Sequence, residues 1–235
     1  MNWRVIDKMN FKDYDKIFVL VSGGIDSTYL YELFKKEHGD KVYPVNCFNP
    51  YEISDTLTQI SKEPNYIQII PGEKYNYGEI LRDAFLQLPK AREMRKNGVY
   101  SKKVFACCYF LKHKAFKKDP RFQEPNTVVI SGIKLGDGQQ RFFWLNSLKN
   151  RNVFFHRHKE GQLYAYPFRD YRQRDLPEII IKRLRKKYPT LDHSGCKICP
   201  VLVLFNLKEE KRFKASYDYA HKLGVLKNHL LTEWI

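Results

Sequence analysis

A glycine-rich turn near the start of the chain, Ser22-Gly-Gly-Ile-Asp-Ser27, constrains the fold more than any other stretch. It follows a short apolar segment, Lys16 to Val21, that is typical of a buried strand. It precedes a helical pattern that runs from Thr28 to His38 and stops at Gly39. Such a turn can bind an anion, because glycines let a ligand approach the backbone amides and the helix dipole favours negative charge. Its spacing matches neither the P-loop nor the dinucleotide-binding pattern, and the alternative is an ordinary strand-to-helix turn.

The pattern Ser-Gly-Gly-X-Asp-Ser resembles the pyrophosphate loop of the ATP pyrophosphatases, enzymes that cleave ATP between its α and β phosphates. The resemblance implies that the two serines and the loop amides hold pyrophosphate, and that Asp26 helps to hold Mg²⁺. We therefore expect an adenine nucleotide, ATP in the first place, to bind at Ser22, Gly23, Gly24, Asp26 and Ser27.

Strand and helix patterns alternate along the rest of the chain. Strands are predicted at 41–48, 66–70, 127–130 and 163–168. Helices are predicted at 54–62, 77–97 with a break at Pro89, 104–118 and 175–188, and a last one is capped by Asn206 and ends at Gly224. This alternation predicts an α/β fold, a parallel sheet flanked by helices, in which ligands bind at the carboxyl ends of the strands. We expect a single domain over 1–235, with a nucleotide-binding sheet at about 16–150 and a mostly helical part at 151–235.

The charge of the chain restricts its partners. The 235 residues include 42 Lys and Arg against 26 Asp and Glu, which gives a formal net charge of +16. This excess favours a polyanion such as tRNA or DNA, although basic residues can also form an ordinary solvated surface. No apolar run approaches the ~20 residues of a membrane helix, and the polar start Met1-Asn-Trp-Arg4 is unlike a signal peptide. We therefore expect a cytoplasmic protein without a membrane partner.

Four of the five cysteines form two pairs, Cys107-Cys108 and Cys196-Lys-Ile-Cys199. Four thiolates in two pairs can hold Zn²⁺ or an iron–sulfur cluster. Neighbouring side chains on a helix diverge by about 100°, so adjacent cysteines reach two irons of one cluster more easily than a single ion. We therefore favour a [4Fe-4S] cluster over zinc. The alternative is that Cys107 and Cys108 are small buried residues of an apolar helix.

Cys-Cys followed much later by Cys-X-X-Cys resembles the [4Fe-4S] signature of adenylylsulfate reductases, members of the phosphoadenosine phosphosulfate reductase family. That family's domain is itself built on a pyrophosphate-loop fold. Ser131-Gly-Ile-Lys134 with Gln139-Gln-Arg141 is similar to its Gly-X-Arg…Arg segment, with lysine at the first arginine. Tyr166-Pro-Phe-Arg-Asp-Tyr171 resembles its Pro-Leu-X-X-Trp segment, and the resemblance spans about residues 16–200.

The resemblance assigns roles to individual residues. It implies that Lys134 and Arg141 bind the nucleotide phosphates and act in catalysis together with Asp26. It also implies that the metal ligands are Cys107, Cys108, Cys196 and Cys199.

Two further residues leave alternatives open. Lys112, one turn after the first cysteine pair, is a candidate to neutralise the cluster or bind phosphate, or is only a solvated lysine. Cys47, at the end of the second predicted strand, is either a sulfur carrier or a buried core cysteine.

Two departures from the reductase pattern set the predicted function. Sulfonucleotide reductases carry a catalytic cysteine in a C-terminal Glu-Cys-Gly-Leu-His tail, whereas no cysteine follows Cys199 in this sequence. Their loop is usually degenerate, whereas Ser22 to Ser27 has the form found in enzymes that cleave ATP. We therefore expect an ATP pyrophosphatase-type transferase that makes AMP and pyrophosphate, adenylates an acceptor and passes sulfur to tRNA or DNA. A sulfur-donor protein would be a further partner.

Two other functions stay open at this point. One is a sulfonucleotide reductase that forms sulfite with a cysteine supplied by a partner or by Cys47. The other is a non-catalytic nucleotide-binding protein that uses an iron–sulfur cluster as a redox sensor. The sequence sets neither the acceptor nor the oligomeric state, and a homodimer is compatible with it.

Overall fold

The computed structural model describes residues 10–52, 54–72, 74–99, 103–137, 139–147, 155–157, 161–170, 176–191, 195–206 and 210–226. Its internal contacts divide the chain into two compact units. The first, here called the sheet unit, takes the described residues of Met1–Asn46, Ser54–Ile69 and Lys117–Ser194. The second, the helical unit, takes those of Cys47–Ile53, Ile70–Phe116 and Gly195–Ile235. That the chain is one domain loosely divided near residue 150 stays a prediction.

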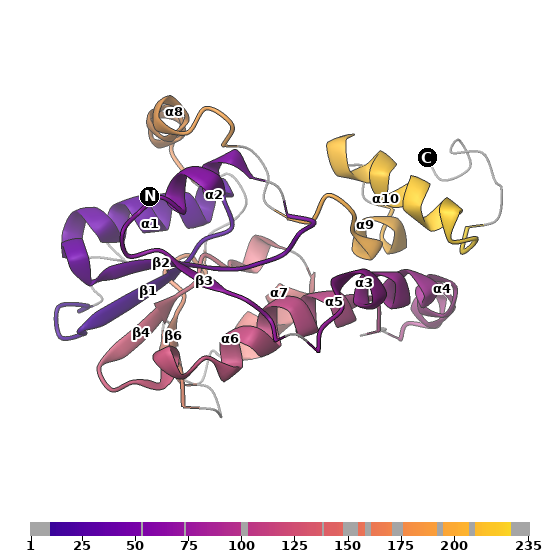
Figure 1. Cartoon of the computed structure of the whole chain (residues 1–235), viewed down its shortest axis with the longest axis horizontal. Helices are drawn as coiled ribbons and strands as arrows, with labels where there is room; N and C mark the ends of the chain where they lie inside the picture. The colour runs from indigo at the N-terminus through magenta and orange to yellow at the C-terminus, as the bar shows by residue number, and fades with distance from the viewer. Residues whose placement is uncertain are drawn as a thin grey trace. The chain divides into compact units, whose positions relative to one another are not determined.

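The sheet unit is built on a six-stranded sheet with the order β3-β2-β1-β4-β6-β5 (Figure 1). The strands are β1 (Lys16–Leu20), β2 (Val42–Cys47), β3 (Ile67–Ile69), β4 (Thr127–Ile130), β5 (Phe155–Arg157) and β6 (Leu163–Ala165). The neighbouring strands β2, β1, β4 and β6 run parallel, and β5 pairs with β6 in the antiparallel direction. The predicted α/β fold with a parallel sheet is therefore confirmed.

The central strand β1 is apolar from Ile17 to Leu20, and its middle residues are buried because both faces of the strand are covered. Ile17 and Val19 point to one face, where they share a core with Leu30 and Phe34 of α1 (Ile25–His38). Phe18 belongs to the other face and packs edge to face on Phe122, with ring centroids 4.9 Å apart. This two-sided burial explains why the β1 segment reads as a continuous apolar run rather than an alternating one.

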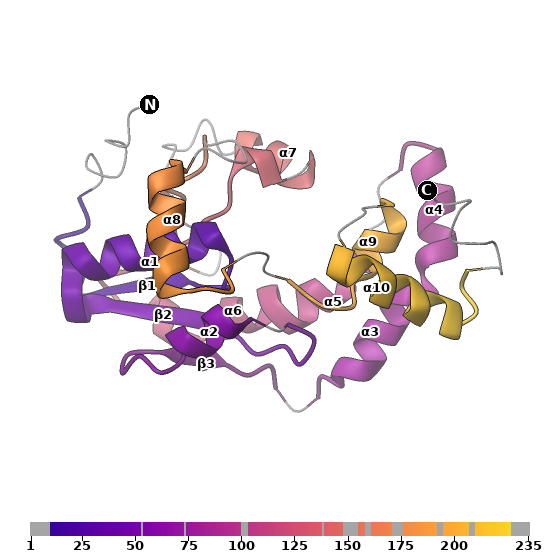
Figure 2. The same cartoon turned by 90° about the horizontal axis from the view of Figure 1, so that it is seen from above.

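The described part of the sheet unit contains four α-helices that lie wholly within it. They are α1, α2 (Asp55–Ile60), α7 (Gln139–Ser147) and α8 (Glu178–Lys187). Helix α1 begins three residues earlier than predicted and ends, as predicted, at Gly39, whose φ of +58° suits glycine. Ser54 caps α2 because its hydroxyl accepts the Leu57 N–H at 3.2 Å. Helix α8 lies across α1 rather than on the strands (Figure 2), and α7 was not predicted.

The helical unit contains α3 (Tyr77–Leu86), α4 (Leu88–Lys96), α5 (Ala106–Cys108), α9 (Pro200–Leu204) and α10 (Glu210–Lys222). After α5 the chain makes a π-helical turn, Tyr109–His113, before α6 (Lys114–Lys118). The unit has its own apolar core, formed by Leu81, Phe85, Leu88, Ala91, Val104, Val203, Leu204, Tyr217, Ala220 and Leu226. The break predicted at Pro89 is confirmed, because α4 starts with this proline in its first turn.

Helices of membrane-spanning length and apolarity do not occur in the described ranges.

Candidate functional site

The turn between β1 and α1 is closed by its two serines. The Ser22 amide donates to the Ser27 hydroxyl at 3.2 Å, and the two hydroxyl oxygens lie 3.1 Å apart. The Ser27 hydroxyl also donates to the carbonyl of Gly24 at 3.1 Å. These bonds hold the turn in one shape, so the two hydroxyls stay together at its centre.

Gly23 is required by this shape. Its φ is +74°, and a Cβ built on it would lie 1.9 Å from the hydroxyl oxygen of Ser54. Gly24 follows as the N-cap of α1 and makes no side-chain capping bond. The first N–H groups of α1 are therefore not capped by that residue, which is the condition for an anion to bind at a helix N-terminus.

A second segment, Ser131 to Lys134, lies beside this turn. It follows β4, and its Ser131 amide donates to the carbonyl of Ala165 at 3.0 Å. A Cβ on Gly132 would lie 3.6 Å from the Ser27 nitrogen, so the backbones of the two segments approach closely. The Lys134 ammonium then reaches the Asp26 carboxylate, with 2.7 Å between Nζ and Oδ2. Two residues predicted from separate motifs thus form an ion pair, in which Lys134 is almost fully buried.

Arg141 is linked to this pair only indirectly. Its side chain is exposed and lies 3.2 Å from the carboxylate of Asp137, one turn earlier in the chain. The same carboxylate oxygen accepts the Lys134 amide at 3.1 Å. Asp137 therefore orders both cationic residues, although only Lys134 reaches Asp26 directly.

Arg169 is a buried cation near this edge of the sheet that sequence reasoning passed over. It follows β6, and its carbonyl accepts the Leu135 amide at 2.9 Å. Its Nε donates to the carbonyl of Leu145 at 3.4 Å, near the end of α7. Its Nη2 is buried without a hydrogen-bond partner in the described chain. The sequence did contain a signal for this residue, because Arg169 belongs to the Tyr166–Tyr171 segment that resembles a family motif. It was not singled out, because an arginine in a loop is usually exposed.

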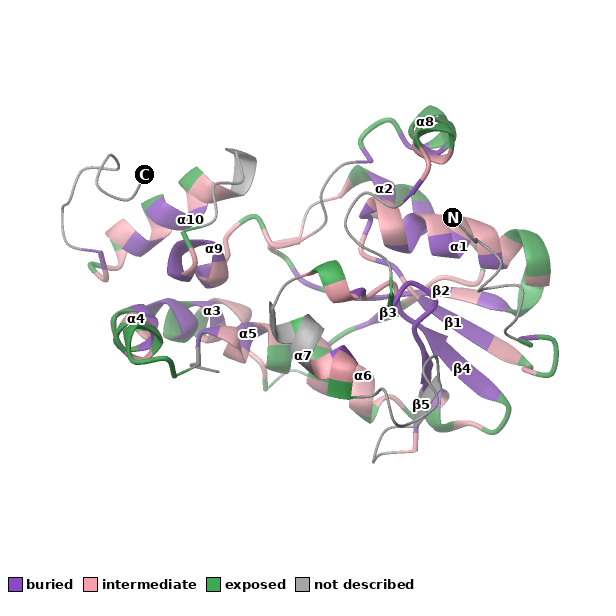
Figure 3. Ribbon diagram, turned by 180° about the vertical axis from the view of Figure 1, so that it is seen from behind, coloured by how far each residue is buried: buried purple, intermediate pink, exposed green. Residues whose placement is uncertain are grey.

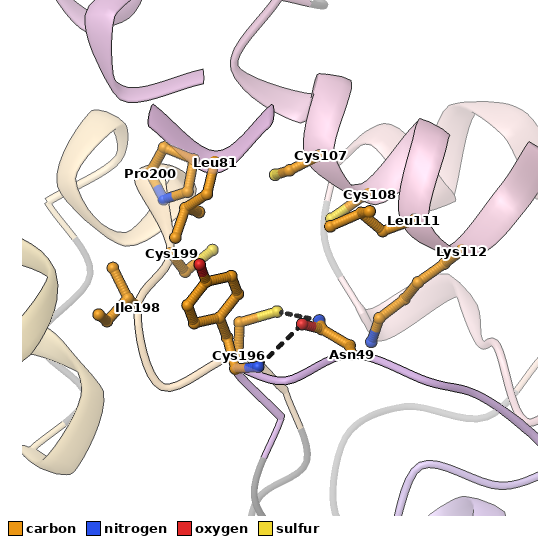
Figure 4. Close-up of a pocket in the computed structure, with 11 residues that line it drawn as sticks. Asn49, Leu81, Cys107, Cys108, Leu111, Lys112, Cys196, Ile198, Cys199 and Pro200 are labelled. Carbon is orange, nitrogen blue, oxygen red and sulfur yellow. Dashed lines mark hydrogen bonds between the residues drawn. The ribbon is translucent and has the colours of Figure 1, made fainter. Parts of the chain in front are cut away.

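The four paired cysteines line one pocket, which lies within the helical unit (Figure 4). Cys107 and Cys108 come from α5, and Cys196 and Cys199 come from the loop before α9. Figure 4 shows the two pairs on opposite sides of this pocket. In the part of the chain that the structure describes, no three Cys, His, Asp or Glu side chains are gathered as ligands of a metal ion.

The protonation of these thiols is set by burial and by their closeness. Burial and the neighbouring Cys108 raise the pKa of Cys199 to about 11. A hydrogen bond with Cys108, together with burial, raises the pKa of Cys107. Four thiolates in this pocket would repel one another strongly, and a bound cationic metal group is what deprotonates clustered cysteines in proteins. The donor set therefore fits an iron–sulfur cluster or another thiophilic metal group.

Lys112 also lines the pocket, where its side chain is half-buried rather than fully solvated. Its ammonium lies 2.7 Å from the carboxylate of Glu52. Burial alone would lower the pKa of Lys112, but the charges of Glu52 and the neighbouring cysteines outweigh it and raise the pKa. Lys112 is therefore a positive charge beside the thiols.

Cys47 is a buried core cysteine. It is 2% exposed, and its thiol donates to the carbonyl of Leu111 at 2.8 Å. Burial raises the pKa of this thiol to about 12, so it is protonated near neutral pH. A sulfur carrier needs a cysteine that is both deprotonated and accessible to solvent. Cys47 is protonated and buried, so it does not meet either condition.

These observations describe a parallel α/β sheet with a glycine-rich turn at the carboxyl end of β1, together with a helical unit that carries a four-cysteine pocket. No protein-family profile matches the chain, and no curated protein matches it. Among solved structures the chain is similar to phosphoadenylyl-sulfate (PAPS) reductase from Candida auris, determined as a phosphate complex, with a TM-score of 0.47 and 8% sequence identity. The match covers 83% of this chain and 92% of the other.

Proposed function

We propose that the protein is a pyrophosphate-loop enzyme that cleaves ATP between its α and β phosphates to adenylate an acceptor for sulfur transfer. An acceptor oxygen attacks the α-phosphorus and pyrophosphate leaves, and a sulfur nucleophile from a donor then displaces AMP from the adenylated acceptor. The observation that carries the proposal is the contact of 2.7 Å between Lys134 and Asp26 at the N-terminal end of α1. It joins the glycine-rich turn to the loop after β4, and a cation and a carboxylate at a helix N-terminus beside a glycine-rich turn support a polyphosphate site there.

Each part of the turn has a role in this proposal. The hydroxyls of Ser22 and Ser27 and the backbone amides of the turn hold the departing pyrophosphate. Asp26 supplies a carboxylate oxygen, the kind of ligand that Mg²⁺ prefers, and Mg²⁺ would neutralise charge on the phosphates. Lys134 stabilises the charge that develops as the α–β bond breaks, and its burial strengthens this effect. Arg141 is the second cation of the predicted set and acts from the exposed side, ordered by Asp137.

The proposed acceptor is a nucleic acid. The net charge of +16 supports it, and so does the surface of α8 (Figure 3). Five basic residues of this helix are exposed, namely Lys182, Arg183, Arg185, Lys186 and Lys187. A dense basic surface of this kind attracts a phosphate backbone over the range of a Debye length.

The four cysteines Cys107, Cys108, Cys196 and Cys199 are proposed to hold a [4Fe-4S] cluster. Their common pocket and the half-buried cation Lys112 support this, since a cluster with four thiolates carries net negative charge. When bound, the cluster would supply a redox-active centre and a covalent link between α5 and the loop before α9.

The decisive experiment is anaerobic incubation of the full chain with Mg²⁺ and ATP labelled at the α-phosphorus, with and without bulk tRNA. We expect the label to leave ATP as AMP or to appear on the tRNA, at a higher rate with tRNA. We expect a loss of at least about a hundredfold on Asp26→Asn or Lys134→Met, typical of removing a group that stabilises transition-state charge. Asp40→Asn is the matched control, because Asp40 is exposed at the far end of α1. Absence of both labelled AMP and labelled tRNA under all conditions would refute the proposal.

The same incubation with a sulfonucleotide and a thiol reductant tests the alternative reductase function by the release of sulfite. The burial of Cys47 argues against this residue as the nucleophile of such a reaction. Sulfite formation would therefore require a cysteine from a partner.

A further inference from the structure

The segment Asn49–Glu52 lies against the Cys196 loop within the helical unit, and the proposed function gives it no role. Its backbone is fixed there at two points. Glu52 forms an isolated antiparallel bridge with Cys196, and the Lys197 amide donates to the Tyr51 carbonyl at 2.6 Å. The side chains of this segment are therefore held at defined positions beside the cysteine pocket.

Asn49 donates a hydrogen bond to a cysteine sulfur. Its Nδ2 lies 2.9 Å from the Sγ of Cys196, and the residue is 7% exposed (Figure 4). Its Oδ1 accepts the Tyr51 amide at 3.0 Å. Because only the oxygen can accept this N–H, the network fixes the orientation of the amide and directs its NH₂ group at the sulfur.

Glu52 brings a negative charge to the same place. Its side chain is 3% exposed, and one carboxylate oxygen, Oε2, pairs with Lys112. The other oxygen, Oε1, is buried and has no hydrogen-bond partner among the described residues. Lys112 itself lines the cysteine pocket, so Glu52 offsets part of the positive potential that this lysine gives to the thiols.

We propose that Asn49 and Glu52 set the reduction potential of the iron–sulfur cluster in opposite directions. The inference rests on the proposed cluster at the four cysteines. One-electron reduction adds negative charge to the cluster and its sulfurs. A donor to Cys196 stabilises the reduced form and raises the potential, whereas the Glu52 carboxylate destabilises the reduced form and lowers it.

The test is a redox titration of the full chain after anaerobic reconstitution with iron and sulfide. Dithionite with redox mediators supplies the electrons, and absorbance and electron paramagnetic resonance report the reduced fraction. At the wild-type midpoint, Asn49→Leu should lower the ratio of reduced to oxidised cluster about fivefold, the effect of one lost hydrogen bond. Asn49→Asp keeps the shape but replaces the donor with a charge, and should lower the ratio further.

Glu52→Gln should raise the same ratio, because it removes a negative charge and leaves Lys112 in place. Glu93→Gln makes the same charge change on an exposed residue of α4 and should leave the ratio unchanged. If the segment had only a structural role, the substitutions at Asn49 and Glu52 would reduce the iron content. They would not shift the reduction potential of the cluster in opposite directions.

The outcomes separate the two proposals. If the wild-type chain shows no iron–sulfide absorbance after reconstitution, the proposed cluster fails, and this inference fails with it. If the cluster loads but the Asn49 and Glu52 variants shift the potential in the same direction, or not at all, the cluster stands and the inference is overturned.

Discussion

At the scale of single residues, the glycine-rich turn depends on one position without a side chain. Gly23 combines a φ of +74° with a hydroxyl of Ser54 that occupies the place of a Cβ. We predict that Gly23→Ala destabilises the chain by about 2 kcal/mol, from strain in the backbone and displacement of Ser54. Urea unfolding followed by circular dichroism measures this loss.

Gly72→Ala is the matched control. Nothing lies within 4 Å of a Cβ at Gly72, and its φ is outside the left-handed region. This substitution should leave the midpoint of unfolding unchanged or slightly higher. Equal effects of the two substitutions would contradict the role given to Gly23.

Asp119 gives a prediction of pH dependence. Hydrogen bonds from the guanidinium of Arg121, the shorter of them 2.5 Å, hold the pKa of this carboxyl below its ordinary value of 3.8. The charged form is therefore favoured by folding, so this stabilisation is complete above the ordinary pKa and is lost as the pH falls through the lowered one. Wild type should be more stable than Asp119→Asn at pH 6, and the difference should shrink below about pH 4. Urea midpoints of both proteins at several pH values measure this, and a difference that is constant with pH would contradict it.

At the scale of elements, the helical unit is held by α3. Phe85 is fully buried in the core of the unit, whereas the next residue, Leu86, is 42% exposed. We predict that Phe85→Ala lowers the free energy of unfolding by about 3–5 kcal/mol, because it leaves a cavity, and that Leu86→Ala lowers it by less than about 1 kcal/mol. Denaturant titration followed by far-ultraviolet circular dichroism compares the two, and similar losses would show that α3 packs differently.

Most elements were predictable from local sequence, and the reasons are specific. β1 and β4 are mostly apolar runs covered on both faces, α1 ends before a glycine, and α4 has in its first turn a proline that cannot continue α3. Three elements were missed because their positions depend on distant partners. β5 has only three residues and is fixed by pairing with β6, and α9 is too short to show a helical period. α7 follows directly on a polar, glycine-rich stretch, and no element was predicted over its residues.

The candidate site also has a part that could be predicted from local sequence and a part that could not. That Asp26 and Lys134 lie on one edge follows from their places after two parallel strands, β1 and β4, and such an edge was expected from the alternating pattern. The contact of Asn49 with Cys196 joins segments that are far apart in the chain. No local pattern encodes it, because an asparagine after a strand is ordinary turn chemistry.

At the scale of the whole molecule, the net charge of +16 predicts salt-dependent binding of tRNA. The logarithm of the association constant should fall linearly with the logarithm of the salt concentration. Replacing Arg183 and Lys186 of α8 with glutamine should reduce the magnitude of the slope by roughly 1–2, about 0.7–0.9 for each lost phosphate contact. Filter binding at several salt concentrations measures the slopes.

The double replacement of Lys90 and Lys96 by glutamine is the matched control, since it removes two exposed lysines from α4. Equal reductions of the slope by the two double variants would show that binding follows total charge rather than the surface of α8.

The helical unit is assembled from three separate stretches of chain, Cys47–Ile53, Ile70–Phe116 and Gly195–Ile235. Its cysteine pocket forms only when the loop before α9 meets α5. These two segments are separated in the sequence by residues 117–194, which belong to the sheet unit. Contacts of such long range slow folding, since the entropy of closing the loop is lost before the contact stabilises the chain. A group that joins all four thiolates would act on the unfolded ensemble as a disulfide does, by restricting the open loops. Iron and sulfide supplied during refolding, rather than afterwards, should therefore give the faster and more complete recovery of the native chain.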